Sequence, residues 1–471
     1  MMNRGVPRTG TSLDETSLAG IETESDDPRL GNFPFFRFPS SVSVWCLYAV
    51  SLGAFAVFVY GQAAHGVFEP IIDLIQKGRH ADALLYPAVL WTLMGMVFLI
   101  FRTCMWVKYR PFPAVSYNDA PVLTVVIPAY NEGAMVLKAI ESVACANYPR
   151  DRLEIFVIDD GSTDDTWSFI RRAAERYPDL VSTMRQATNR GKREALAMGF
   201  ARARGDLIVT IDSDSVIEPG ALLALAGPFR DERVGAVAGK VSVYNLHQGL
   251  IPRMLQVRYA LSFDLLRTVE SAYKNVFCCP GALTAYRAAA VRGVLEAWRQ
   301  QTFLGARCTF GEDRALTNFL FAAGYNTVYQ QSAVVHTVVP TTYKKLCKMY
   351  LRWDRSYVRE ELRFARVIGK RPLRIAAIAL FDRVVTNLRY PVGYASLGLL
   401  LFHGMEHPVM LLRMLMAVGL MSLLNMFYYL WRERSSDFFY GVLYSYFSLI
   451  ALTWIFPYAL MTVRARSWLT R

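Results

Sequence analysis

The chain has 471 residues, too many for one ordinary hydrophobic core, so at least two structural units are expected. Hydrophobic residues make up 53% and charged residues 19%, a composition too apolar for a wholly soluble protein and indicative of a membrane. The net charge of +13 fits Lys and Arg anchors beside a membrane, or phosphate-bearing substrates, and we expect no nucleic-acid partner. The seven cysteines are scattered without a Cys-x-x-Cys pair, which fits a reducing compartment and argues against zinc.

The N-terminal part predicts a tail followed by two membrane helices. Residues 1–38 are rich in Ser, Thr, Asp, Glu and Arg, which predicts a disordered cytosolic tail. Within residues 39–110, two uncharged runs, Ser40–Val67 and Ala83–Phe101, are each long enough to cross a bilayer. Lys108 follows the second run and marks that end as cytoplasmic, so the large middle region is expected to face the cytosol.

Residues 115–340 have the pattern of an α/β domain. Apolar strands that end in polar loops are expected at 123–133, 153–165 and 207–211, with helical segments between them. This alternation predicts a mixed, mostly parallel sheet. Ligands of such sheets bind outside the carboxyl ends of the strands.

Carboxylates gather at these predicted strand ends. Asp212 and Asp214 follow the strand "LIVTI", and Asp159 and Asp160 follow "LEIFVI". Two carboxylates that converge at a strand end can bind a hard cation, which in turn binds phosphate oxygens. An Asp-x-Asp pattern alone is more often a turn, so this alternative stays open at this point.

The motifs "VVIPAYNE", "VIDDGSTDDT", "NRGKREAL", "DSDS", "FGEDRALTN" and "LRWDRS" occur in this order between apolar segments. This series resembles that of membrane-embedded, processive family 2 glycosyltransferases, and most of all the hyaluronan synthases and the rhizobial chitin-oligosaccharide synthases. The resemblance covers roughly residues 40–471. It implies a GT-A-type fold, UDP-sugar donors, a growing polysaccharide as acceptor and a lipid bilayer as surroundings.

The resemblance also implies roles for donor-site residues. Tyr130 would stack on uracil, and Asp159 and Asp160 would accept hydrogen bonds from uracil or ribose. Lys192 would offset phosphate charge. The metal ligands would be Asp212 and Asp214, with Mg²⁺ or Mn²⁺ as the cofactor and Asp212 part of the UDP-sugar site.

A second group of residues is assigned by the same resemblance to catalysis and to the acceptor. Asp313 would be the general base. Gly281 would let the backbone approach the acceptor sugar. Arg352 would pair with the diphosphate, and Trp353 would offer an aromatic face to the sugar. The chain departs from the family by Ala282, where a proline usually follows the glycine, and by Met349, where the motif has glutamine.

The C-terminal part predicts interfacial and membrane helices. Residues 341–389 are expected to form amphipathic interfacial helices, one of them at 372–390, and another is expected at 262–277. Residues 390–471 contain three further uncharged runs, and Pro457 could split the last of them. These runs are Tyr390–Met405, Met414–Trp431 and Phe438–Val463.

Together these features predict an inverting, metal-dependent, processive glycosyltransferase in the cell membrane. It would use UDP-N-acetylglucosamine with UDP-glucuronate to make and export a hyaluronan-like polymer, with Arg287, Arg314 and Arg352 available to the glucuronate carboxylate. Three alternatives remain open. They are a synthase of N-acetylglucosamine oligomers, a non-processive transferase acting on a lipid phosphate, and a transporter or channel with a regulatory cytosolic domain.

Overall fold

The computed structural model describes residues 81–405, 408–433 and 437–465, together with residues 53, 57 and 435. The expected N-terminal tail, nearly all of the run Ser40–Val67 and the last six residues lie outside this part, so those expectations remain predictions.

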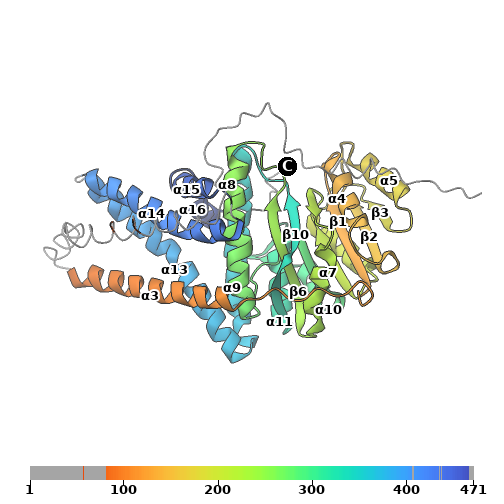
Figure 1. Ribbon diagram of the computed structural model, residues 1–471, viewed down its shortest axis with the longest axis horizontal. Coiled ribbons are helices and arrows are strands. Elements are labelled where there is room, and N and C mark those ends of the chain that lie inside the picture. The colour runs from red at the N-terminus through yellow and green to blue at the C-terminus, as the bar shows by residue number, and fades with distance from the viewer. Residues whose placement is uncertain are drawn as a thin grey trace, which may run out of the picture.

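A mixed sheet forms the centre of the middle region (Figure 1). In the described part of the chain its eight strands have the order β3-β2-β1-β4-β7-β6-β10-β5. Neighbours pair in parallel, except that β7 is antiparallel to both β4 and β6, and β5 is antiparallel to β10. The mixed, mostly parallel sheet predicted from the sequence is therefore confirmed. Its strands are β1 (Leu123–Ala129), β2 (Leu153–Asp159), β3 (Val181–Arg185), β4 (Leu207–Ile211), β5 (Ser215–Ile217), β6 (Val234–Val243), β7 (Leu283–Arg287) and β10 (Asn326–Thr337).

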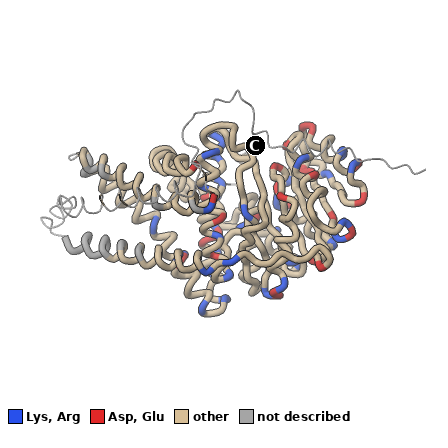
Figure 2. Tube along the Cα trace, in the orientation of Figure 1, with Lys and Arg blue, Asp and Glu red and all other residues tan. Residues whose placement is uncertain are grey.

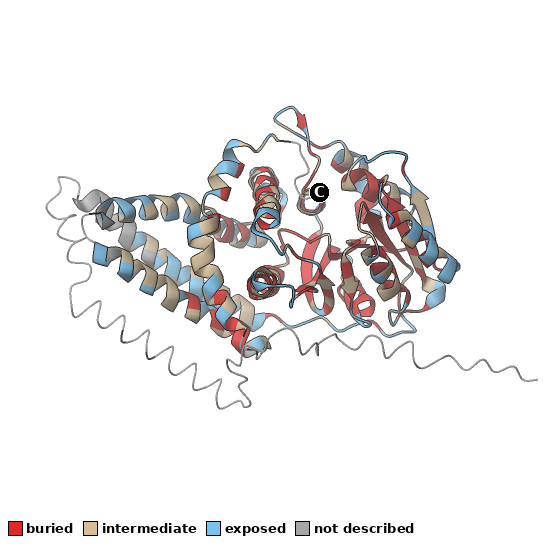
Figure 3. Ribbon diagram, turned by 90° about the horizontal axis from the view of Figure 1, so that it is seen from above, coloured by how far each residue is buried: buried red, intermediate tan, exposed pale blue. Residues whose placement is uncertain are grey.

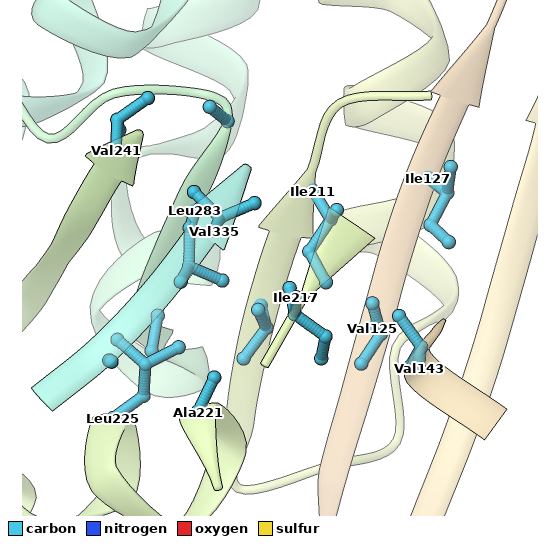
Figure 4. Packing of buried hydrophobic residues seen from close by; sticks show 14 of the residues in the cluster. Val125, Ile127, Val143, Ile211, Ile217, Ala221, Leu225, Val241, Leu283 and Val335 are labelled. Carbon is cyan, nitrogen blue, oxygen red and sulfur yellow. The ribbon is translucent and has the colours of Figure 1, made fainter. Parts of the chain in front are cut away.

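Helices cover both faces of this sheet. This explains why β1 and β4 carry apolar side chains on both faces and not on one face only. Val125 and Ile127 of β1 pack on one face with Val143 of α4 and Ala221 of α7 (Figure 4). Val126 points to the opposite face, against α6, α10 and α11. The helices are α4 (Met135–Ala144), α5 (Thr166–Arg176), α6 (Lys192–Arg202), α7 (Ala221–Ala226), α10 (Ala288–Arg299) and α11 (Glu312–Ala322), and a short hairpin, β8 (Thr302–Phe303) and β9 (Ala306–Arg307), precedes α11.

The remaining helices lie to one side of the sheet, with α8 and α9 standing between the sheet and the helices that extend away from it (Figure 1). Short 3₁₀ helices lie at Arg150–Arg152, Gly227–Arg230 and Ile368–Lys370. The helices of this part are α3 (Ala81–Lys108), α8 (Leu250–Tyr259), α9 (Leu266–Ala272), α12 (Tyr343–Val367), α13 (Leu373–Gly404), α14 (Pro408–Glu433), α15 (Phe438–Phe447) and α16 (Ile455–Met461), with π-helical segments at Ala260–Leu265 and Ser448–Leu452.

Three helix boundaries differ from those expected. The helix expected at 262–277 begins at Leu250 and ends at Ala272, because α8, a π-helical segment and α9 follow one another directly. The interfacial helix at 372–390 and the next apolar run are one helix, α13, which continues through Pro391. The last run breaks between its π-helical segment and α16, before Pro457.

Large apolar side chains are exposed along the extended helices. α3 carries no charged residue from 83 to 101, and charged residues gather instead over the sheet and its junction with the helices (Figure 2). Residues inside the sheet domain are buried, whereas most residues of the extended helices are exposed or of intermediate exposure (Figure 3). The exposed apolar side chains include Leu90, Leu93, Val97, Leu99 and Ile100 of α3, Leu399, Leu401 and Phe402 of α13, and Leu412, Met416 and Met421 of α14.

Among the residues that the structure describes, no single helix combines the length and the apolar composition of a membrane span, whereas Phe438–Leu452 and Ile455–Met461, with a 45° bend between them, meet both criteria as a pair.

A buried carboxylate joins the sheet to the extended helices. Asp264, in the π-helical segment, accepts hydrogen bonds from the Tyr329 hydroxyl at 2.9 Å and the Gln331 amide at 2.6 Å, both on β10. Its other oxygen lies 4.0 Å from Lys240 of β6 and 4.0 Å from Arg432 of α14. Three separate elements therefore share one carboxylate, and π-helical turns of this kind are often found at functional positions.

We expect Asp264→Ala to lower the free energy of unfolding by ~3–5 kcal/mol, because its buried hydrogen-bonding and charged partners would be left without a carboxylate. The thermal unfolding midpoint of the purified chain measures this. Asp151→Ala is the control, since the Asp151 side chain is 81% exposed. Equal midpoints for the two variants would contradict a role for Asp264 at the junction.

Candidate active site

A cavity of about 360 Å³ lies where the sheet meets α8, α9, α11 and α12. It is bounded by the carboxyl end of β4, the first turns of α6 and α11 and the loop before β7. Residues from distant parts of the sequence therefore meet in one space. Of the residues predicted from the sequence, it is lined by Lys192, Asp212, Asp214, Gly281, Asp313, Arg352 and Trp353.

Lys192 lies between two carboxylates at one end of this cavity. Its Nζ is 2.5 Å from Asp212 Oδ1 and 3.3 Å from Glu312 Oε1. Burial alone would lower the pKa of Lys192, but Asp212 and Glu312 together raise it above its ordinary value, so the ammonium stays charged. Burial alone would likewise raise the pKa of Glu312, whereas Lys192 holds it below its usual range.

Asp313 lies beside Glu312 in the first turn of α11. Its carboxylate accepts a hydrogen bond from the Arg314 backbone N–H at 2.7 Å and is 3.6 Å from the Cys278 thiol. Burial and the neighbouring Glu312 charge raise the pKa of Asp313. A carboxylate of raised pKa that faces a cavity is a suitable proton acceptor, and perturbed groups of this kind cluster at functional sites.

Gly311 fixes the place where α11 begins. Its φ is +72°, a left-handed conformation that favours glycine, and a side chain there would overlap Ser356 of α12. The first turn of α11, with Glu312 and Asp313, can therefore approach α12 closely.

Gly281 provides a second close approach. A Cβ at this position would lie 2.8 Å from Lys192 Nζ and 3.2 Å from Asp212 Oδ1. The absence of a side chain therefore leaves room for the ion pair between them.

Asp212 and Asp214 suit a hard cation. Both line the cavity, and Asp214 Oδ1 lies 3.3 Å from the Thr337 hydroxyl. Among the described residues, no group of three or more His, Cys, Asp or Glu side chains could hold a metal ion. Two carboxylates still fit Mg²⁺ or Mn²⁺, because such ions are commonly held by one or two carboxylates with substrate phosphates and water as the other ligands.

Aromatic side chains form another part of the cavity wall. The ring of Trp353 lies 6.3 Å from that of Tyr259, 6.2 Å from that of Phe263 and 5.7 Å from that of Tyr350, measured between centroids. Met349, in the motif position of the glutamine, is buried, and its sulfur is 3.9 Å from the Tyr259 hydroxyl. This wall can stack on the apolar face of a sugar ring.

Three predicted residues lie at strand ends without lining the cavity. Tyr130 follows β1 and is partly exposed. Asp159 forms an ion pair with Arg185 at 3.0 Å. Asp160 is buried and accepts three hydrogen bonds within the chain, two of them at 2.8 Å from the backbone N–H groups of residues 190 and 191. Asp160 thus holds the loop that leads to Lys192, and the nucleotide-binding roles of these residues remain predictions.

The expectation for Arg287 is wrong. Its guanidinium donates to the backbone carbonyls of Val234, Phe229 and Asp231 at the far end of β7 and does not line the cavity. Arg314 and Arg352 do line it.

Many cavity residues carry no role in the sequence-based assignment, and four charged ones are important for the site. Glu312 adjoins Asp313 in the sequence, but its contact with Lys192 is visible only in the fold. Asp354 belongs to the motif "LRWDRS", which assigns it no separate role. Arg258 and Arg389 lie in helices whose sequences give no signal beyond amphipathicity.

Comparison with known proteins gives the same family over most of the chain. Residues 124–295 match the family described as Glycosyl transferase family 2. The chain is 31% identical over 383 residues to a hyaluronan synthase of Streptococcus pyogenes, with 80% of this chain and 89% of that protein covered. It is 31% identical over 371 residues to an N-acetylglucosaminyltransferase of Rhizobium meliloti, with 78% and 83% covered.

A solved structure shares the fold. The mannosyltransferase of Pyrobaculum calidifontis, in complex with GDP-Man and Mn²⁺, superposes with a TM-score of 0.55 at 22% identity, covering 77% of this chain and 98% of that one. At this identity the similarity supports the GT-A-like fold alone.

We expect Gly281→Ala to displace the Lys192 ammonium from Asp212 and to lower the free energy of unfolding by about 1 kcal/mol, since the end of a flexible side chain can move. Thermal unfolding measures this effect. Gly293→Ala is the control, because a Cβ in that helical position meets no atom within 4 Å. A Gly281→Ala midpoint equal to that of the control would mean that the ion pair tolerates the methyl group.

Proposed function

The chain belongs to glycosyltransferase family 2, and on this premise we propose that it is an inverting, metal-dependent, processive enzyme that builds a β-linked polysaccharide from UDP-sugars. The observation that carries this proposal is that one cavity holds the carboxylate pair Asp212 and Asp214, a lysine, the further carboxylate Asp313 and an aromatic wall. These are the groups needed for a diphosphate, a proton and a sugar acceptor. With the glycosyltransferase activity established by family, a transporter or channel without catalysis is set aside.

At the donor end, Asp212 and Asp214 would hold Mg²⁺ or Mn²⁺, which when bound offsets the charge that develops on the UDP leaving group. The Lys192 ammonium would face the same phosphates. Tyr130, at the end of the neighbouring strand, would stack on uracil, and Asp159 and Asp160 would support the nucleoside.

At the reaction centre, Asp313 would accept the proton of the acceptor hydroxyl as that oxygen attacks the anomeric carbon. The bond from that carbon to the UDP oxygen breaks on the opposite side, so the configuration inverts. The Arg352 guanidinium would contact the diphosphate. Trp353 and Gly281 would lie against the acceptor sugar.

Cavity arginines without a carboxylate partner favour a product that contains a uronic acid. Arg258, Arg314 and Arg389 line the cavity, and within the described residues none of them has a carboxylate within 4.0 Å. A glucuronate carboxylate could receive charge-assisted hydrogen bonds from such groups. We therefore favour a hyaluronan-like polymer made from UDP-N-acetylglucosamine and UDP-glucuronate.

The main alternative is an N-acetylglucosamine oligomer, which the likeness to rhizobial N-acetylglucosaminyltransferases supports. Transfer to a lipid phosphate is less well supported. The aromatic wall around Trp353 suits a sugar acceptor better than a phosphate.

We further propose that the enzyme is a multi-pass protein of the cell membrane with its sheet domain in the cytoplasm. The exposed apolar side chains of α3, α13 and α14 support this location, because lipid would cover them. Lys108 and Arg110 at the end of α3 support the orientation.

We expect Asp212→Ala and Asp214→Ala each to lower turnover by at least ~10²-fold, because each removes one metal ligand. Release of UDP from membranes, with and without added Mn²⁺, measures this, and thermal unfolding checks the fold. The assignment is refuted if the double variant in excess EDTA still releases UDP at nearly the wild-type rate.

We expect Asp313→Asn to leave UDP affinity within a few fold while turnover falls by the ~10²–10⁴ that a general base contributes. Calorimetry with UDP separates binding from turnover. Glu312→Gln is the matched comparison, because it removes the neighbouring carboxylate beside Lys192 but leaves Asp313 as the base, so turnover should fall much less. Lost UDP binding in Asp313→Asn would move this residue to nucleotide recognition.

The product itself tests the proposed function. Membranes containing the enzyme receive UDP-N-acetylglucosamine alone, and then together with UDP-glucuronate. A long polymer that forms only with both donors and is cut by hyaluronidase is the expected result. A chitinase-sensitive product from the single donor would establish the alternative, and absence of UDP release with every donor would overturn both.

A further inference from the structure

A second cavity adjoins the first. It has a volume of about 210 Å³ and lies among α12, α13, α15 and α16. Tyr350, Asp354 and Tyr390 line both cavities. A chain that passes from one cavity into the other therefore passes these three side chains.

The second cavity offers aromatic faces. Tyr390 is stacked on Phe456 with 3.9 Å between ring centroids and 7° between planes. The hydroxyl of Tyr350 is hydrogen-bonded to that of Tyr444 at 2.8 Å, and the Tyr394 hydroxyl donates to the Thr453 carbonyl at 2.7 Å. Because these hydroxyls already have partners, the ring faces are what the wall can offer to a sugar.

Asp354, unlike these tyrosine hydroxyls, has no hydrogen-bond partner among the described residues. Within the described residues, its carboxylate has no hydrogen bond and no ion pair. Burial raises the pKa of Asp354 to about 7, although the charges of Arg314, Arg258 and Arg389 act in the opposite direction. The Asp354 side chain is partly exposed and lines both cavities, so its carboxylate is available to the hydroxyl donors of a ligand there.

We propose that Asp354 accepts hydrogen bonds from the hydroxyl groups of a sugar lying across the junction of the two cavities, and that this contact holds the growing chain between transfers and so determines product length. The inference rests on the proposed function, since it requires a sugar polymer in the first cavity. Neutral hexoses and N-acetylhexosamines carry the hydroxyl donors that a carboxylate can bind in pairs.

The sequence neighbour of Asp354 connects this contact to transfer. Trp353 precedes it on α12 and lies in the wall of the first cavity. One turn of helix therefore presents an aromatic face to the sugar at the reaction centre and a carboxylate to a sugar further along. Loss of the carboxylate should let the chain dissociate sooner without removing the groups that carry out transfer.

The test compares Asp354→Asn and Asp354→Leu with the wild type in membranes supplied with both donors. Product length is measured by size-exclusion chromatography and initial rate by UDP release. We expect products shorter by at least ~5-fold, as loss of one or two charge-assisted hydrogen bonds implies, with an initial rate within a few fold of wild type. Glu175→Gln, an exposed carboxylate of α5, is the control for product length.

Thermal unfolding distinguishes this role from a structural one. Because Asp354 has no partner in the described part of the chain, both substitutions should leave the midpoint unchanged or raise it. Wild-type product length in both variants, or a lowered midpoint with unchanged length, would overturn the inference. If folded variants released no UDP, the inference would also be overturned, and Asp354 would belong to the transfer step. If the wild type itself released no UDP with either donor, the proposed function would be refuted.

Discussion

The ion cluster around Lys192 is the constraint on which the rest of the site depends. The ammonium belongs to the first turn of α6, while its partners, Asp212 and Glu312, follow β4 and begin α11. The cluster is only partly exposed, so removing one partner is costly, because it leaves a charge in an incompletely solvated place. These three segments are therefore held together, and Asp313 next to Glu312 keeps a defined position relative to the strand-end carboxylates.

A second polar cluster fixes α12 against α11. Glu360 is 1% exposed and accepts hydrogen bonds from the amides of Gln301 at 2.7 Å and Asn318 at 3.1 Å. Arg359, beside it, donates to the Phe310 carbonyl at 2.5 Å. Since Trp353 lies two turns earlier on the same helix, the aromatic wall is fixed relative to Asp313 by groups that never touch a ligand.

The sequence predicts those parts of the molecule that depend on local pattern. The strands before Asp160 and Asp212 are mostly apolar, and the parallel arrangement brings the ends of such strands to one edge, so these two carboxylates were expected near each other. The place of Lys192 in the same site followed only from the resemblance. Arg287 was misjudged because its partners are backbone carbonyls of a loop that approaches only in the folded chain. The boundary inside α13 was misplaced because it followed the charge pattern, in which an uncharged run begins at Tyr390, whereas the helix continues through this point and through Pro391.

Pro391 also has a mechanical consequence. A proline inside a helix has no N–H to donate to the carbonyl four residues earlier, so α13 is more compliant at this point than elsewhere along its 32 residues. The preceding residue, Tyr390, lines both cavities and is stacked on Phe456. The proline in the longest described helix therefore lies next to a residue that lines both cavities. Bending there would move Tyr390 and so change the space where the two cavities meet.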